Sequence, residues 1–221
     1  SDYYAFILDR EGHLLSVLEW HGGKVSGALE TKDGGFLSWG GKILRLRSRE
    51  GHLLSVLKGH IADVSGALET KDGRFLSWSH DSPGLRFEMS VDCLLRELRC
   101  LRLWGSDGSE IVVLEGHTKW VQGALETKDG RFLSWSGDKT LRLWDRDGKP
   151  LAVLEGHIEG VDGAIETSDG RFLSWSLDGT LRLWDRDGKF FAVFVVERYG
   201  GSFCVLETRD GRFLSWHPYL N

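Results

Sequence analysis

The stretch GRFLSWSLDGTLRLWDRDGK, residues 170–189, decides the fold, because the chain contains it almost twice. Residues 130–149 read GRFLSWSGDKTLRLWDRDGK and differ from it only at Gly137/Leu177 and Lys139/Gly179. Its tetrapeptide FLSW occurs five times, beginning at residues 36, 75, 132, 172 and 213, with spacings of 39, 57, 40 and 41 residues. A fixed period sets the architecture of a chain, so we predict five copies of one unit of about 40 residues.

One repeat, residues 117–156, contains four apolar stretches that are separated by turns rich in Asp and Gly. This punctuation predicts short strands joined by hairpins. The four predicted strands, called a, b, c and d below, cover residues 121–126, 131–136, 140–144 and 150–154. Four strands in about 40 residues are typical of one blade of a β-propeller.

The repeated motifs themselves resemble those of a known family. Gly-His occurs at 59/60, 116/117 and 156/157, DGRFLS follows it in each repeat, and LRLWD occupies 141–145 and 181–185. These motifs resemble the WD-repeat β-propeller family, particularly the near-identical repeats of its bacterial members, and the resemblance covers almost the whole chain. It implies an all-β fold with four-stranded antiparallel blades.

The resemblance also implies a hydrogen-bonded tetrad in each blade. Its members are a His after strand d, a Ser in strand b, an Asp in the b–c turn and a Trp in strand c. The matching sets are His117, Ser134, Asp138 and Trp144; His157, Ser174, Asp178 and Trp184; and His60, Ser77, Asp81 and Trp104, the last of which follows an insertion. The first repeat has Arg47 at the Trp position, and the last repeat keeps only Ser215.

The two ends of the chain complement one another. The last repeat stops after strands a (202–207) and b (212–216), while residues 3–19 align with a c–d hairpin. We therefore predict a single five-bladed propeller in which the N-terminal c and d strands complete the C-terminal blade, since closure removes bare sheet edges. The predicted blades are 21–59, 60–116 with an insertion at 82–100, 117–156, 157–196, and 197–221 together with 1–20.

Two features of the repeats allow two interpretations each. Residues 90–98 of the insertion have the apolar spacing of a short helix, yet residues 84–98 also align with a c–d hairpin. We prefer the hairpin, which could pack against another subunit.

The Trp of FLSW is bulky where family members have a small residue. It either fills the wide wedge between five blades or forms an exposed platform for sugars.

Every repeat ends strand a with a glutamate: Glu30, Glu69, Glu126, Glu166 and Glu207. The turn TKDG separates Glu126 from Arg131, so we expect a cross-strand ion pair of structural value in this and the equivalent hairpins. A ring of carboxylates for cation binding or acid–base chemistry is the alternative. His21, His60, His117 and His157 hold the tetrad position, and His13 and His52 are expected in exposed c–d turns.

Composition excludes several classes of function. The net charge of −5 arises from 33 acidic and 28 basic residues mixed along the chain, which disfavours nucleic acid as a partner. No apolar run is long enough to span a membrane, and no signal peptide is visible, so a cytoplasmic location is expected. The three cysteines lack metal-ligand spacing, and no catalytic motif is present. We predict no metal, no cofactor and no enzymatic activity.

The resulting hypothesis is a non-catalytic scaffold for protein–protein interaction, with an unidentified protein or peptide as the partner. A lectin-like propeller is the alternative, followed by a propeller glycoside hydrolase. The loops between strands d and a and between b and c vary most within the copied repeats, and the family commonly receives partners on that face. The candidate contact residues there are Trp20, Lys24, Asp63, Lys119, Trp120, Glu159, Arg198 and Tyr199.

Overall fold

The computed structural model describes residues 5–8, 11, 14–18, 25–79, 101–196 and 204–216. Every secondary-structure element in these ranges is a β-strand, which confirms the all-β prediction. The chain divides into two compact units, residues 1–115 and 116–221, which are described separately.

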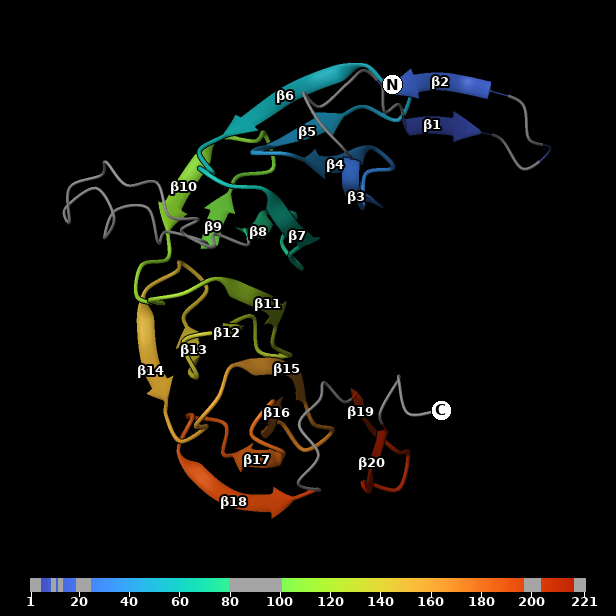
Figure 1. Ribbon diagram of the computed structural model, residues 1–221. Coiled ribbons are helices and arrows are strands. Elements are labelled where there is room, and N and C mark those ends of the chain that lie inside the picture. Colours follow the sequence, from blue (N-terminus) through green and yellow to red (C-terminus); the bar gives the residue numbers. More distant parts are fainter. Residues whose placement is uncertain are drawn as a thin grey trace. The chain divides into compact units, whose positions relative to one another are not determined.

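The first unit contains two four-stranded antiparallel sheets and one hairpin (Figure 1). The first sheet has the order β3 (Val25–Glu30), β4 (Phe36–Gly40), β5 (Ile43–Arg47) and β6 (Leu53–Lys58). The second consists of β7 (Val64–Glu69), β8 (Phe75–Ser79), β9 (Leu101–Trp104) and β10 (Glu110–Val113). The hairpin is formed by β1 (Ala5–Leu8) and β2 (Leu14–Leu18).

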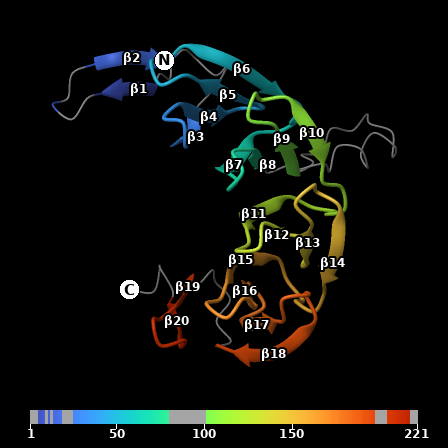
Figure 2. The same ribbon diagram turned by 180° about the vertical axis from the view of Figure 1, so that it is seen from behind.

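The second unit repeats this organisation (Figure 2). Its first sheet has the order β11 (Val121–Glu126), β12 (Phe132–Ser136), β13 (Leu141–Trp144) and β14 (Pro150–Leu154). The next consists of β15 (Val161–Glu166), β16 (Phe172–Ser176), β17 (Thr180–Trp184) and β18 (Phe190–Val195). A two-stranded sheet of β19 (Cys204–Glu207) and β20 (Phe213–Trp216) follows.

The predicted blade plan is confirmed in four repeats. Strands β11 and β14 have the predicted bounds, and β12 and β13 each begin one residue later than expected. In the second repeat β8 pairs with β9, so the hairpin that begins at Leu101 completes that blade. The insertion at 82–100 therefore separates strands b and c, and its own conformation lies outside the described residues.

Two short sheets correspond to the two halves of the predicted fifth blade. Strands β19 and β20 have the a–b arrangement, and β1 and β2 form the hairpin that the alignment assigned to c and d. Within the described residues each of the two hairpins is a separate two-stranded sheet. Their union in one blade, and with it the closed ring, stays a prediction.

Leucines of strands b and c form the core, because alternate residues of these central strands face the neighbouring blade. In the second unit Leu133, Leu141 and Leu143 are almost fully buried and belong to a cluster that also contains Phe172 and Trp184 of the next blade. This packing holds consecutive blades of the unit face to face. It also fixes the strand ends at which the tetrads and loops lie.

A glycine in strand a explains the tryptophan of FLSW. Gly123 lies opposite Trp135 in the register, and a Cβ atom built on Gly123 would lie 2.3 Å from Cζ2 of that indole. The same pairing holds for Gly27 with Trp39, Gly66 with Trp78 and Gly163 with Trp175. The indole thus packs flat on its own sheet, and Trp39 is only 8% exposed. The immediate contact of the indole is the cross-strand glycine, and its role in filling the wedge between five blades stays a prediction.

Within the described residues, no helix is long and apolar enough to cross a membrane.

Candidate functional site

The third and fourth repeats build the complete tetrads that the resemblance implied. In the third, His117 Nε2 lies 2.8 Å from Ser134 Oγ, and Nδ1 lies 2.9 Å from Asp138 Oδ2. Trp144 Nε1 donates to the same serine oxygen at 2.9 Å. The fourth repeat reproduces the network with His157, Ser174, Asp178 and Trp184, each contact being 2.9 Å long. The tetrad thus connects strands b and c to the loop that precedes strand a.

Burial and hydrogen bonds together set the charges of the tetrad histidines and aspartates. Desolvation lowers the pKa of His117 and His157 below the ordinary value, although their aspartate partners oppose the shift. Burial alone would raise the pKa of Asp138, but hydrogen bonds from His117, Thr140 and the Thr118 N–H outweigh it and hold the pKa well below its usual range. A neutral imidazole and an ionised aspartate are therefore the stable forms, which suits a structural network.

In the second repeat, His60 contacts two serines. His60 Nε2 contacts Ser77 Oγ at 2.7 Å, and Trp104 Nε1 donates to that oxygen at 2.8 Å. His60 Nδ1 lies 3.1 Å from Ser79 Oγ, and Asp81 lies outside the described residues. Burial, assisted by the nearby Arg102 cation, lowers the pKa of His60 to about 3. This histidine is neutral at physiological pH.

The first repeat has an arginine in place of the tetrad tryptophan. Arg47 occupies the tryptophan position, is 4% exposed, and donates from Nη1 to the Gly51 carbonyl oxygen at 3.1 Å. The position thus remains buried, but its hydrogen bond goes to the adjacent c–d turn. This agrees with the expectation of a degraded tetrad.

The expected Glu–Arg pairs across the a–b hairpin are wrong. Thr127 N–H donates to the Arg131 carbonyl at 2.8 Å, so Arg131 lies opposite Thr127, and Glu126 pairs with Phe132 in the register. The loop has three residues, with Gly130 at φ 84°, instead of the assumed four. Arg131 instead contacts Asp129, with its Nε 2.9 Å from Oδ2.

The glutamates instead connect consecutive blades. Glu166 Oε2 accepts a hydrogen bond from the Lys128 N–H at 2.6 Å, and Lys128 Nζ donates back to the Thr167 carbonyl at 2.8 Å. In the first unit Lys32 and Glu69 form the same contact at 2.8 Å. Glu207 accepts from both the N–H and the hydroxyl of Ser168 at 2.7 Å. A glutamate and the residue after the turn threonine thus form an interblade clamp, which local sequence spacing could not reveal.

Trp120, the most prominent recognition candidate, lies against its own blade. A Cβ atom built on Gly137 would lie 2.5 Å from the Trp120 indole, so this glycine makes room for the ring. In the fourth repeat the large and the small residue change places: Gly160 occupies the position of Trp120, and Leu177 occupies the position of Gly137. The paired exchange in two otherwise copied repeats is the signal that could have predicted this contact.

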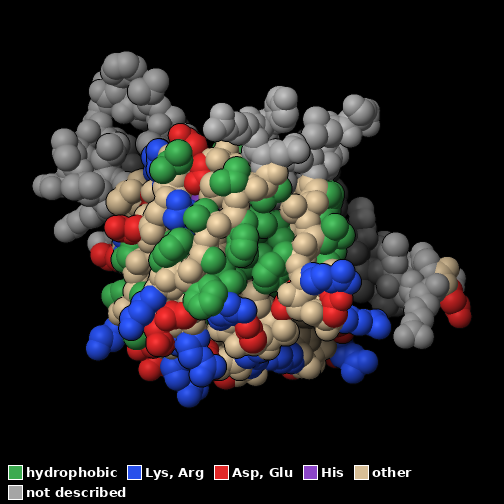
Figure 3. Space-filling model, turned by 90° about the horizontal axis from the view of Figure 1, so that it is seen from below, with side chains coloured by type: hydrophobic (Ala, Val, Ile, Leu, Met, Phe, Trp, Pro, Cys, Tyr) green, Lys and Arg blue, Asp and Glu red, His purple; other side chains and the backbone are tan. Residues whose placement is uncertain are grey.

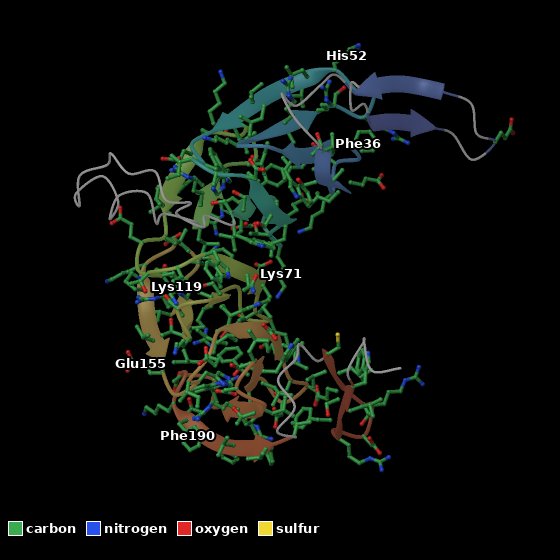
Figure 4. All side chains as sticks on the ribbon, viewed as in Figure 1. Phe36, His52, Lys71, Lys119, Glu155 and Phe190 are labelled. Carbon is green, nitrogen blue, oxygen red and sulfur yellow. The ribbon has the colours of Figure 1, made fainter. Side chains whose placement is uncertain are left out.

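The other candidates of the second unit lie around the same loops. Lys119, labelled in Figure 4, is exposed, and its Nζ lies 6.0 Å from the centre of the Trp120 ring. Glu159 Oε1 lies 3.8 Å from Lys139 Nζ, and that amine also donates to the Ile158 carbonyl at 2.6 Å. The structure therefore brings Glu159 to the b–c turn of the preceding blade.

The remaining candidates are not brought into this group. Asp63 is exposed in the first unit, next to Ile61, which is 42% exposed. Trp20, Lys24, Arg198 and Tyr199 lie outside the described residues. Sequence reasoning missed Ile158 and Leu177, which are 69% and 44% exposed and belong to the same pair of loops.

The described ranges contain no group of three His, Cys, Asp or Glu side chains that could hold a metal ion. The tetrad histidines and aspartates, whose pKa values are lowered, hydrogen-bond to one another. The tetrads therefore form a structural hydrogen-bonded network. The variable loops beside them are exposed at the surface.

Two of the repeats match a family model. Residues 108–145 and 148–185 match the model of the WD domain, G-beta repeat. These two repeats are therefore similar to WD repeats, and the match covers about a third of the chain. WD-repeat propellers are generally non-catalytic scaffolds that mediate protein interactions. No curated protein gives a significant match to the sequence.

The solved structures similar to this chain include a WD40 β-propeller. The WD40 β-propeller domain of Doa1 has a TM-score of 0.64 and 24% identity, and the match covers 92% of this chain and 63% of that one. The computationally designed Ika8 protein has a TM-score of 0.69 and 20% identity, with 94% and 62% covered. At these identities the likeness concerns the fold alone, and the chain spans less than two thirds of either structure.

Proposed function

We propose that this chain is a cytoplasmic, non-catalytic scaffold of the WD-repeat type that binds a protein or peptide on the face formed by its d–a loops and b–c turns. The observation that carries the proposal is the variation among the loops of this face. In repeats that are otherwise copied, the third has Thr118 and Gly137 where the fourth has Ile158 and Leu177, two exposed apolar side chains.

The neighbouring groups suit a peptide ligand. Lys119 and Glu159 supply opposite charges beside the apolar pair, and the Leu177 N–H is bonded to the Gly160 carbonyl at 3.2 Å, which holds the two loops together. A central apolar contact surrounded by polar groups is the usual composition of a protein interface. The loops differ between repeats, so one contact surface is favoured over several identical sugar sites.

Site-specific photo-crosslinking tests this proposal. A photoreactive residue at Ile158 should capture a partner in cells of the source organism, and the same residue at Lys149, in the c–d turn at the other end of the strands, should not. The variant I158D should abolish capture by a probe at Leu177 without lowering the melting temperature. Capture from position 149 alone would contradict the proposed face. Specific binding on a glycan array, or glycosidase activity, would favour one of the two alternatives.

The proposal includes a five-bladed ring closed by the chain's own ends. Removal of residues 1–19 should leave the last a–b pair without its c strand and produce oligomers or aggregates, because exposed edges recruit other strands. Size-exclusion chromatography with light scattering measures the result. A truncated protein that stays monomeric and unfolds as cooperatively as the full chain would contradict closure.

A further inference from the structure

The fourth blade ends in an edge strand that has no polar residue. In the order β15–β16–β17–β18, strand β18 is the last of its sheet within the described residues, so one side of its backbone is unpaired there. Its sequence is FFAVFV. Figure 3, which views the molecule from the side of β18 in Figure 1, shows hydrophobic side chains gathered on that surface. A long apolar edge is a template for pairing with another strand.

The other d strands carry residues that discourage such pairing. Lys58 ends β6, Glu110 begins β10, and Pro150 begins β14. The register places Phe194 opposite Leu181 and Leu154 opposite Leu141, so Val195 occupies the position of Glu155. At this position β18 has lost the charge that its near-identical neighbour retains.

Every side chain of β18 except Ala192 is exposed, and Phe190 and Phe194, on the face of Ala192, are 54% and 45% exposed. Phe191, Val193 and Val195 are 60%, 45% and 74% exposed, and their side chains point to the same face of the sheet. Ala192, between them, points to the other face and packs against the core cluster of Leu181 and Leu183. The packing of the next blade onto Ala192 therefore leaves the Phe191–Val195 face uncovered.

We propose that β18 pairs antiparallel with β18 of a second copy of this chain. A two-fold axis perpendicular to the sheet keeps the same face of both strands on the same side. With the axis at Val193, the two Val193 residues oppose each other and Phe191 opposes Val195 of the second copy. All residues from Phe190 to Val196 then have an opposite residue, and the two sheets continue into one.

A second copy fits this edge better than the other d strands do. An edge without charges requires a partner strand that is uncharged and has apolar residues at alternate positions, and β18 itself meets both conditions. Strands β6, β10 and β14 would introduce a Lys, a Glu or a Pro. The Arg171 guanidinium, 4.8 Å from the Phe191 ring, covers one end of the stripe and leaves Val193 and Val195 for the junction. One strand from each copy is a small interface, so we expect reversible dimerisation.

Sedimentation velocity over a concentration series tests the pairing. Wild-type protein should pass from monomer to dimer as concentration rises. The variant V193K should raise the dissociation constant at least about tenfold, because the axis brings the two lysines opposite one another. V195E, which restores the charge found at Glu155, should act in the same direction. V153K in β14 is the matched control, since Val153 is 42% exposed at the equivalent position of the preceding blade.

A disulfide tests the register. In a background with Cys93, Cys100 and Cys204 changed to serine, V193C should form a covalent dimer on oxidation, because directly opposed residues lie within disulfide reach. V195C should cross-link far less, since Phe191 opposes it. Three results would overturn the proposal: a wild type that is monomeric at all concentrations, dimerisation that survives both V193K and V195E, or equal weakening by V153K. Circular dichroism confirms that each variant is folded.

Discussion

The first and fourth blades place different residues at one position. Trp184 lies opposite Phe172 in the fourth blade, and Arg47 lies opposite Phe36 in the first. Both side chains are buried, at 1% and 4% exposure. The tryptophan donates to Ser174 in the neighbouring strand at 2.9 Å, whereas the arginine donates to a carbonyl of its own c–d turn.

Comparison of the first and fourth blades shows which interactions are needed to form a blade. Both sheets have four strands in the same order, and their b and c strands pair with the same register despite the altered residue. Strand pairing therefore follows from the apolar alternation that the blades share, although the b–c turn of the first blade is one residue shorter. The tetrad adds stability between strands b, c and the entry loop, and a blade can lose it without losing its sheet.

The largest expected effect comes from removing the tryptophan. W184A should lower the free energy of unfolding by about 3–5 kcal/mol, the usual cost of truncating a buried aromatic residue. R47L should cost less, because leucine keeps an apolar side chain at this buried position, whereas W184A removes a large aromatic ring. Urea denaturation followed by circular dichroism measures both. Equal losses would show that the first blade depends on Arg47 as the fourth does on its tetrad.

A smaller effect is expected from the glycine that carries the indole. In G163A the new methyl group would meet Trp175 Cζ2 at 2.1 Å, so the ring must move, at a cost of about 1–3 kcal/mol. The last repeat serves as a natural comparison, because Cys204 opposes Trp216 there and that indole is 43% exposed. C204G should therefore be close to neutral. Thermal unfolding of the two variants separates the cases.

Acid should weaken the second blade through His60. The pKa of this histidine is about 3 in the folded protein and 6.5 in the unfolded chain, so as pH falls the unfolded chain takes up the proton first. The contribution of neutral His60 to the free energy of unfolding is therefore fully present above pH 6.5 and is lost progressively as the pH falls to about 3. Between pH 6.5 and 5.5 the loss is about 1 kcal/mol, following proton linkage. H60Q should remove this part of the pH dependence, and an unchanged slope in that variant would contradict the assignment.

The smallest effect is expected at the interblade clamp. E166A removes the acceptor of the Lys128 N–H and should cost about 1 kcal/mol or less, the net value of one hydrogen bond. The exposed Glu155, labelled in Figure 4, gives the matched control E155A, which should change stability very little. Differential scanning calorimetry is sensitive enough to compare them. A larger loss in E155A would contradict the clamp.

Local patterns predicted the fold well. The bounds of β11 and β14 could be predicted from the spacing of turns within one repeat, and the members of two tetrads from the resemblance to WD repeats. The partner of Glu126 could not, because one residue in the turn count changes which residue it opposes. The clamp between Lys128 and Glu166 joins two repeats, and the contact between His60 and Ser79 depends on side-chain reach. Such contacts depend on the three-dimensional arrangement of the strands and cannot be predicted from the spacing within one repeat.

The interblade clamp has a consequence for the history of the gene. At three joints a repeat supplies the acceptor for the repeat before it: Glu69 for Lys32, Glu166 for Lys128 and Glu207 for Ser168. A joint of this head-to-tail kind accepts any number of identical units. Unequal recombination between near-identical DNA segments could therefore insert or delete a whole blade, and the new neighbours would already be complementary.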